Sequence, residues 1–224
     1  MIKRLNFNFA FTLAEVLITL GIIGVVAALT LPALIANYNK HVVETRLEKF
    51  YSLMNQAVRM SENYHGEFQY WYNETLYGDA KGMKKWWNTY LAPYIKTLKL
   101  ETDKTDQNAL WVYLADGTKF RVFNYFSSSS VEKSSAMHLF FYPKANNKSN
   151  INGKDYFVFF ISADTNKKYL PVEPYKYGWD GTEDGLINGS FGCRKSMNNS
   201  GRHYCTALIQ YNGWKIPKNY PFRF

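Results

Sequence analysis

A long apolar run near the N-terminus constrains this chain more than any other feature. It covers residues 11–36 and contains one charged residue, Glu15. As a helix, a run of this length would extend about 39 Å, which exceeds the ~30 Å hydrocarbon core of a bilayer. Lys3 and Arg4 precede the run, and the next charged residue after Glu15 is Lys40. The excess of positive charge on the N-terminal side places the first residues in the cytoplasm and the rest of the chain outside it.

The carboxylate inside the apolar run argues against an ordinary secretory signal peptide. Such a signal has an apolar core of roughly 7–15 residues and is cut after it, which would leave a soluble protein beginning near Asn37. An acidic residue at the centre of a membrane helix costs roughly 2.5–3.5 kcal/mol on insertion scales, so a disposable signal has little reason to contain Glu15. An uncleaved single-span anchor is the other alternative.

The residues around Glu15 resemble a known processing site. The block Ala10-Phe11-Thr12-Leu13-Ala14-Glu15 is similar to the cleavage site of type IV prepilins and type II secretion pseudopilins, in which a small residue, most often Gly, precedes Phe-Thr-Leu-x-Glu. The resemblance implies that a prepilin peptidase and methyltransferase cuts between Ala10 and Phe11 and methylates the new amino group. Residues 1–10 would then be the leader, residues 11–36 the transmembrane and assembly helix, and residues 37–224 a periplasmic or extracellular head.

The resemblance also implies a location and partners. Proteins of this kind are stored in the bacterial inner membrane with a cytoplasmic N-terminus, and an inner-membrane assembly platform joins them to other pilin subunits in a filament. The formal net charge is +9, and loss of Lys3 and Arg4 with the leader would leave 25 basic and 18 acidic side chains, or +7. A basic head could meet DNA or an acidic cell surface. The lysines are thinly spread, however, which favours a solvated surface charge.

Glu15 and Pro32 have roles that the resemblance implies. In the family, the glutamate pairs with the terminal amine of a neighbouring subunit, which would here be the amine of Phe11. An unpaired charge is expensive in an apolar environment and a paired one much less so, although a carboxylate near the membrane boundary could also face lipid headgroups. Pro32 removes one helical hydrogen bond, a disruption of ~3 kcal/mol in water, and should loosen the helix locally. The family's proline at this distance from the cut lies where the helix unwinds in filaments.

A helical pattern continues beyond the apolar run. Apolar residues recur at helical spacing to about Glu62, while charged residues occupy the other faces. This stripe consists of Val43, Leu47, Phe50, Met54, Ala57 and Val58. One helix of roughly 50 residues, with its second half packed on a globular head, is the architecture that the resemblance implies and that the spacing supports independently.

The rest of the chain predicts a small α+β head. Residues 83–94 read as a second helix or helical turn, and residues 205–212 as a short helix ended by Gly213. Strands are expected at residues 109–114 and 118–125, which flank an Asp-Gly hairpin turn, and at residues 137–142 and 156–162. Residues 162–197 are rich in glycine and read as irregular loop. The expected fold class is α+β, with the long helix packed on an antiparallel sheet of about four strands.

The two cysteines indicate a structural cross-link rather than chemistry. In an exported chain, Cys193 and Cys205 are most simply a disulfide that closes a C-terminal loop, worth roughly 2–3 kcal/mol. His203 lies near Cys205, but no fourth ligand with zinc spacing is visible. Calcium is an alternative for the acidic residues of the C-terminal loops, yet their spacing matches no EF-hand. These residues are Asp164, Asp180, Glu183 and Asp184.

No sequence motif of an enzyme is present. The chain lacks Gly-x-Ser-x-Gly, HExxH and a phosphate-binding glycine loop, and its four histidines are scattered. The sequence therefore predicts a structural subunit of a type IV pilus-like filament that needs no cofactor. The alternatives are a pseudopilin of a type II secretion system and a single-span anchored binding protein that never polymerises.

The first testable prediction concerns processing. The mature chain should begin at an N-methylated Phe11, because the block that resembles the prepilin site is intact from Phe11 to Glu15. Mass spectrometry of the N-terminal peptide measures this directly. A chain that begins at Met1 would instead indicate an uncleaved anchor, and one that begins near Asn37 a secreted protein.

Overall fold

The computed structural model describes residues 11–71, 80–103, 109–124, 137–146, 149–161 and 171–224. The chain divides into two compact units, Met1–Asn39 and Lys40–Phe224. Helix α1 (Leu13–His65) begins in the first unit and ends in the second, and all described strands and remaining helices belong to the second. The expected α+β class and the long N-terminal helix are confirmed.

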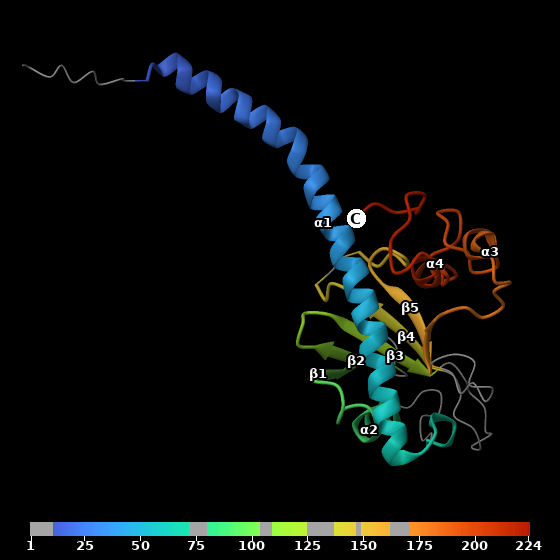
Figure 1. Cartoon of the computed structure of the whole chain (residues 1–224). Helices are drawn as coiled ribbons and strands as arrows, with labels where there is room; N and C mark the ends of the chain where they lie inside the picture. Colours follow the sequence, from blue (N-terminus) through green and yellow to red (C-terminus); the bar gives the residue numbers. More distant parts are fainter. Residues whose placement is uncertain (1–10, 72–79, 104–108, 125–136, 147–148, 162–170) are drawn as a thin grey trace, which may run out of the picture. The chain divides into compact units, whose positions relative to one another are not determined.

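The second part of α1 is amphipathic and forms one side of the core. Its buried apolar side chains are the six of the predicted stripe, from Val43 to Val58. Figure 1 shows this part of the helix lying across the sheet. Gly66 follows the helix with a φ of 79° and donates its N–H to the carbonyl of Glu62 at 2.9 Å. A glycine in the left-handed conformation is a common helix end because it has no Cβ to clash.

Six antiparallel strands form one sheet in the order of the chain. The four strands expected from the sequence are present. The sheet has one further strand at each edge, so the prediction of about four strands is two too low. Gly117, with a φ of 78°, permits the expected Asp-Gly turn between the second and third strands. The strands are β1 (Thr97–Thr102), β2 (Ala109–Leu114), β3 (Lys119–Asn124), β4 (Met137–Tyr142), β5 (Phe157–Ile161) and β6 (Val172–Pro174).

Phe50 of α1 packs at the centre of the inner sheet face. Its ring lies 4.1 Å from the ring of Phe141 in a stacked arrangement, and 5.1 Å from each of the rings of Phe120 and Phe159. These three phenylalanines come from adjacent strands, and all four rings are buried. The aromatic content of the sequence therefore fills a core between the helix and the sheet.

Side chains of α1 also hold two distant segments by hydrogen bonds. The buried amide of Asn55 accepts from the N–H of Val172 at 3.0 Å and donates to the carbonyl of the same residue at 2.8 Å. It thereby pairs an edge of β6 as a neighbouring strand would. Nearer the start of the unit, the buried carboxylate of Glu44 accepts from the N–H of Ile216 at 2.9 Å. Both contacts fix C-terminal segments to the helix.

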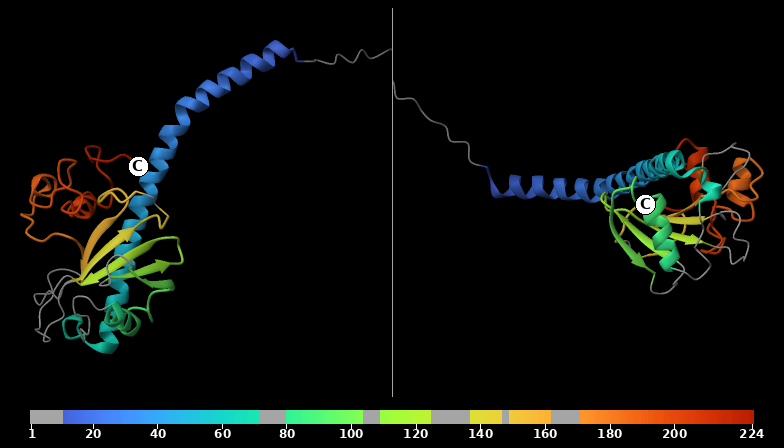
Figure 2. Two further views of the ribbon diagram at one scale, coloured as in Figure 1. Left: turned by 180° about the vertical axis from the view of Figure 1, so that it is seen from behind. Right: turned by 90° about the horizontal axis from the view of Figure 1, so that it is seen from below.

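The remaining helices lie around the sheet. Helix α2 contacts the inner face through Trp87, whose ring lies 5.4 Å from that of Phe120. It begins at Ala80 and ends at Tyr90, and a turn follows, so the helix predicted over residues 83–94 is confirmed with an earlier start and an earlier end. Figure 2 shows the same elements from two further directions. The short helices are η1 (Phe68–Tyr70), α2 (Ala80–Tyr90), α3 (Glu183–Asn188) and α4 (Cys205–Tyr211).

The expectation of an irregular segment over residues 162–197 is partly wrong. Residues 162–170 lie outside the described residues, but β6 and α3 fall within the remainder. Helix α3 begins where the Thr182 hydroxyl accepts from the N–H of Gly185 at 2.9 Å, and Leu186 is its buried residue. Helix α4 agrees with the predicted C-terminal helix, and Gly213 follows it with a φ of 64°.

A prediction of pH dependence follows from a histidine in β4. Burial, together with the nearby His203 ring, lowers the pKa of His138 to about 4. The folded chain then binds fewer protons than the unfolded chain between about pH 6.5 and pH 4, so stability is full above this window and falls as the pH drops through it. The head should lose about 2 kcal/mol of unfolding free energy from this group between pH 7 and pH 5.

Denaturant unfolding at the two pH values, followed by near-ultraviolet circular dichroism, measures the loss. His138→Gln cannot titrate and should reduce the difference between the two pH values. His41→Gln is the matched control because the side chain of His41 is 69% exposed. An unchanged pH dependence in His138→Gln would contradict the assignment to His138.

Candidate functional site

The first part of α1 presents apolar side chains on all sides. Phe11 is 86% exposed, and Leu13 and Leu29 are 77% and 75% exposed. Within the described residues, α1 is the one helix long and apolar enough to cross a membrane, judged by length and composition. A continuous exposed apolar surface of this kind marks a contact with lipid or with other protein. The helix thus fits the predicted transmembrane segment of residues 11–36.

Two hydroxyl groups in this segment are satisfied by the helix itself. The Thr19 hydroxyl donates to the carbonyl of Val16 at 2.9 Å, and the Thr30 hydroxyl donates to the carbonyl of Val26 at 2.9 Å. In an apolar environment, polar groups need such internal partners. The segment therefore carries its threonines without an unpaired hydroxyl donor.

Glu15 forms a capping box with Thr12 at the start of α1. The carboxylate Oε2 accepts from the backbone N–H of Thr12 at 2.9 Å and from its hydroxyl at 2.8 Å. In return, the N–H of Glu15 donates to the Thr12 hydroxyl oxygen at 3.2 Å. Thr-x-x-Glu is the usual sequence of this motif, which satisfies helix N–H groups that have no partner within the helix.

The capping box adds a local role to the two roles considered for Glu15. The sequence signal for a capping box is Thr12 followed three residues later by Glu15, whereas the resemblance implied a partner outside the chain. Both described bonds to the carboxylate reach Oε2 and leave Oε1 with no hydrogen bond to a described residue. The carboxylate can therefore cap its own helix and still accept a hydrogen bond from an amine.

The structure brings only some of the processing and assembly residues together. Phe11 directly precedes the Thr12 and Glu15 pair, whereas Ala10 lies outside the described residues. Pro32 lies inside α1, and the helix is continuous through it. The proline still removes one donor, since it has no N–H. The helix of the single chain is therefore not interrupted at Pro32, where the sequence predicts a local loosening.

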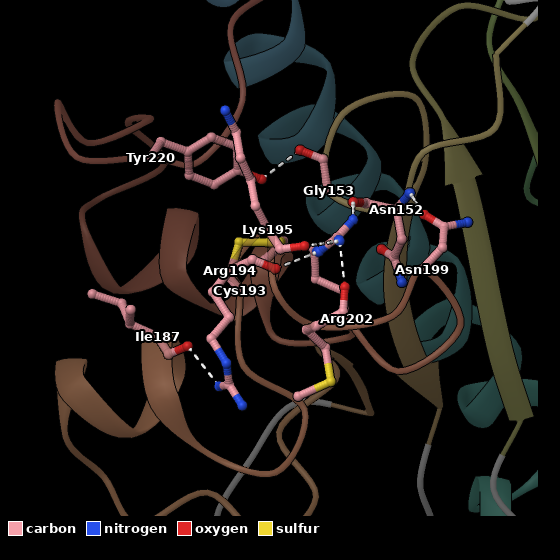
Figure 3. Close-up of a disulfide and its surroundings, with 11 residues drawn as sticks. Asn152, Gly153, Ile187, Cys193, Arg194, Lys195, Asn199, Arg202 and Tyr220 are labelled. Carbon is pink, nitrogen blue, oxygen red and sulfur yellow. Dashed lines mark hydrogen bonds between the residues drawn. A yellow bond between two sulfur atoms is a disulfide. The ribbon is translucent and has the colours of Figure 1, made fainter.

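The predicted disulfide is present and lies in a region cross-linked by hydrogen bonds. Cys193 and Cys205 are bonded, with their Cα atoms 4.7 Å apart. Gly153 lies against this bond with a φ of 82°, and a Cβ there would come within 2.4 Å of Cys205 Sγ. The hydroxyl of Tyr220 donates to the carbonyl of Gly153 at 2.5 Å (Figure 3). This glycine is required by both its conformation and its neighbour.

Arg202 organises the loop that the disulfide closes. Its buried guanidinium donates to the carbonyls of Arg194 at 2.8 Å and Asn152 at 3.2 Å, which Figure 3 labels, and to the carbonyl of Met197 at 2.5 Å. It also stacks on Phe222, whose ring centroid lies 4.8 Å from Cζ. The planar guanidinium suits this work because it presents several donors in fixed directions. Sequence reasoning had assigned no role to this arginine.

The acidic residues considered for calcium have other partners in the described part of the chain. Asp180 accepts from the N–H and the hydroxyl of Thr182, and these bonds lower its pKa. Glu183 accepts from the side chain of Asn212. Asp164 lies outside the described residues. Over residues that the structure describes, no group of three histidine, cysteine, aspartate or glutamate side chains is placed to hold a metal ion.

The fold and these sites define an α+β protein with a single apolar N-terminal helix and a disulfide-bonded head. The chain belongs to a family of unknown function, DUF6613, whose model matches residues 33–224. Comparison with curated proteins and with solved structures gave no match. The family match covers the head and begins at the end of the apolar run, so it does not include the block at residues 10–15.

Loss of the disulfide should destabilise the head. The free energy of unfolding of the double variant Cys193→Ser/Cys205→Ser should be about 2–3 kcal/mol lower than that of the parent, because the bond restricts the unfolded chain. Denaturant unfolding of the variant and of the parent measures this difference. Reduction of the parent with dithiothreitol is the matched control and should give the same loss. Equal stability with and without the bond would show that the Arg202 hydrogen bonds alone hold the loop.

Proposed function

We propose that this protein is a structural subunit of a type IV pilus-like filament, cut before Phe11 and polymerised through the first part of α1. The observation that carries the proposal is the coincidence, in one segment, of a prepilin-like processing block and a helix with exposed apolar side chains and a single carboxylate at its start. A chain of this kind needs two environments in turn. The bilayer covers the apolar segment before assembly, and the helices of other subunits cover it afterwards.

The geometry of Glu15 supports a role in joining subunits. Cleavage before Phe11 creates an α-amino group one residue from Thr12, which is the capping partner of Glu15. The capping box holds the carboxylate at the helix start, and its Oε1 can accept from the amine of a neighbouring Phe11. Within an apolar filament core, two opposite charges are stable together where each alone is not. The pair would register one helix against the next.

The same features fit a pseudopilin of a secretion system, which is processed and assembled in the same way. They also fit a single-span anchored binding protein, which would be inserted into the membrane but would never polymerise. Filament incorporation separates polymerising subunits from a solitary anchor. The charge on Glu15 is the feature to vary.

Substitutions at Glu15 should separate the capping role from the pairing role. Glu15→Gln retains an oxygen that can cap Thr12, because glutamine also completes a capping box, but it removes the charge. If pairing drives assembly, Glu15→Gln and Glu15→Ala should both reach the membrane at parental levels or above, and both should incorporate at least tenfold less into filaments. Immunoblots of membranes and of sheared filaments measure the two levels.

Thr12→Ala is the matched control because it weakens the cap and keeps the charge. It should incorporate into filaments more efficiently than either Glu15 variant. The pairing role is wrong if Glu15→Gln incorporates as well as the parent. Absence of the parent itself from sheared material, despite normal membrane levels, would favour the non-polymerising anchor.

A further inference from the structure

The sheet face opposite α1 carries two rows of aromatic and charged side chains. Alternate residues of a strand point to opposite faces. Phe120 and Phe141 point to the inner face, so the residues next to them along each strand point to the outer face. In the first row, Lys99 is opposite Tyr113, Tyr113 opposite Lys119, and Lys119 opposite Tyr142. The left view of Figure 2 looks at the sheet from this side.

The second row runs parallel to the first. It contains Glu101, Trp111, Arg121 and Phe140, which are also paired in register. We call the two rows together the outer sheet face. Its residues are Lys99, Glu101, Trp111, Tyr113, Lys119, Arg121, Phe140 and Tyr142. Lys99 is exposed and the other seven are partly exposed, with the ring of Tyr142 stacked on that of Tyr156 at a centroid distance of 5.4 Å.

Lys119 lies at the centre of the outer sheet face among three aromatic rings. Its Nζ is 4.7 Å from the ring centroid of Trp111, 5.4 Å from that of Tyr142 and 5.7 Å from that of Tyr113. Lys99, on the neighbouring strand β1, has its Nζ 5.8 Å from the ring centroid of Tyr113. Aromatic faces attract cations, which holds the ammonium groups over the rings. Lys119 forms no ion pair with any residue that the structure describes.

The acidic groups near this face are already paired. Glu101 forms an ion pair with Lys99. Asp103, at the end of β1, lies with Oδ2 2.9 Å from Arg121 Nε and accepts from Trp111 Nε1 at 3.0 Å. The carboxylates of this face therefore position two cations and a tryptophan. Lys119 forms no ion pair with a described carboxylate, although the charge of Glu101 acts on it at longer range.

We infer that the outer sheet face binds single-stranded nucleic acid. Each nucleotide carries a flat base and one phosphate, and this face offers the matching pair repeatedly, an aromatic ring beside a cation. Proteins that bind single strands use rings on which bases stack and cations that follow the backbone. Several do so on the open face of an antiparallel sheet. Lys119 would contact a phosphate, and Tyr113 and Tyr142 would stack on bases to either side of it.

An acidic polysaccharide fits this face less well. Sugars are held by many directional hydrogen bonds, and two of the groups here that could provide them are engaged within the protein. The indole N–H of Trp111 is donated to Asp103, and the hydroxyl of Tyr142 is donated to Asn150 at 3.0 Å. Duplex DNA fits less well again, because its bases are stacked on one another and cannot reach the rings.

Binding of a fluorescein-labelled oligothymidylate of about 20 nucleotides, a length that spans several stacking sites, tests the inference. The full chain in detergent micelles is titrated at several salt concentrations, and fluorescence anisotropy gives the affinity. Lys119→Gln should weaken binding about fivefold at low salt and make the salt dependence shallower by about 0.7 in the logarithmic slope. Tyr113→Ala should weaken binding at least fivefold by removing a stacking ring.

Lys84→Gln is the matched control, since it makes the same charge change at an exposed position of α2, which contacts the inner face. It should change the affinity less than twofold. An equal loss in Lys84→Gln and Lys119→Gln would overturn the inference in favour of general electrostatic attraction. So would the absence of binding by the parent, or displacement of the oligonucleotide by duplex DNA or polygalacturonate as readily as by unlabelled single strand.

Cross-linking gives a readout that needs no protein variant. An oligonucleotide that contains bromodeoxyuridine is irradiated with the parent chain, and peptide mapping locates the attachment. The attachment should fall in β2, β3 or β4, on residues of the outer sheet face. Attachment confined to α1, α2 or the C-terminal region would overturn the inference, whatever the affinity.

Discussion

The packing of Phe50 among Phe120, Phe141 and Phe159 is the interaction on which the rest of the head depends. It selects one face of the sheet as the inner face, and the alternation of side chains along each strand then assigns every other residue to the outer face. A shift of one residue in any of β2 to β5 would exchange the two sets. In β3, such a shift would point Lys119 and Arg121 into the core, where unpaired charges are strongly unfavourable. The register of the strands therefore determines both which side chains pack against the helix stripe and which form the outer sheet face.

The parts of the fold that could be predicted are those with local signals. The α1 stripe repeats at helical spacing, β2 to β5 are rich in aromatic and branched side chains, and the two cysteines lie twelve positions apart near the C-terminal end of the chain. β1, β6 and α3 lack such signals. β1 has a bulge between Thr97 and Lys99 and leaves Leu98 66% exposed. β6 has three residues including Pro174, and besides β5 it is held by the side chain of Asn55, 117 positions away. Helix α3 contains Gly185 and exists through its Thr182 cap and the burial of Leu186.

The candidate sites were predictable to different degrees for similar reasons. Thr12 and Glu15 are three residues apart, so their capping box could be predicted directly from the sequence. The outer sheet face could not be recognised in this way. Its rings and cations alternate across strands rather than along them, and the alternation becomes visible only when the register of four strands is known. Arg202 was equally hidden, since its partners are backbone carbonyls, which every sequence has.

The bonds from Asn55 to Val172 and from Glu44 to Ile216 have a consequence for the order in which the head folds. Each joins positions more than a hundred residues apart, and such contacts form slowly because a long loop must close first. Synthesis delivers the N-terminal part of the chain before the segments that it contacts. The apolar stripe of the helix therefore stays uncovered until the strands on which it packs, β3 to β5, have been made. During that interval the incomplete head exposes apolar surface and is most prone to aggregate.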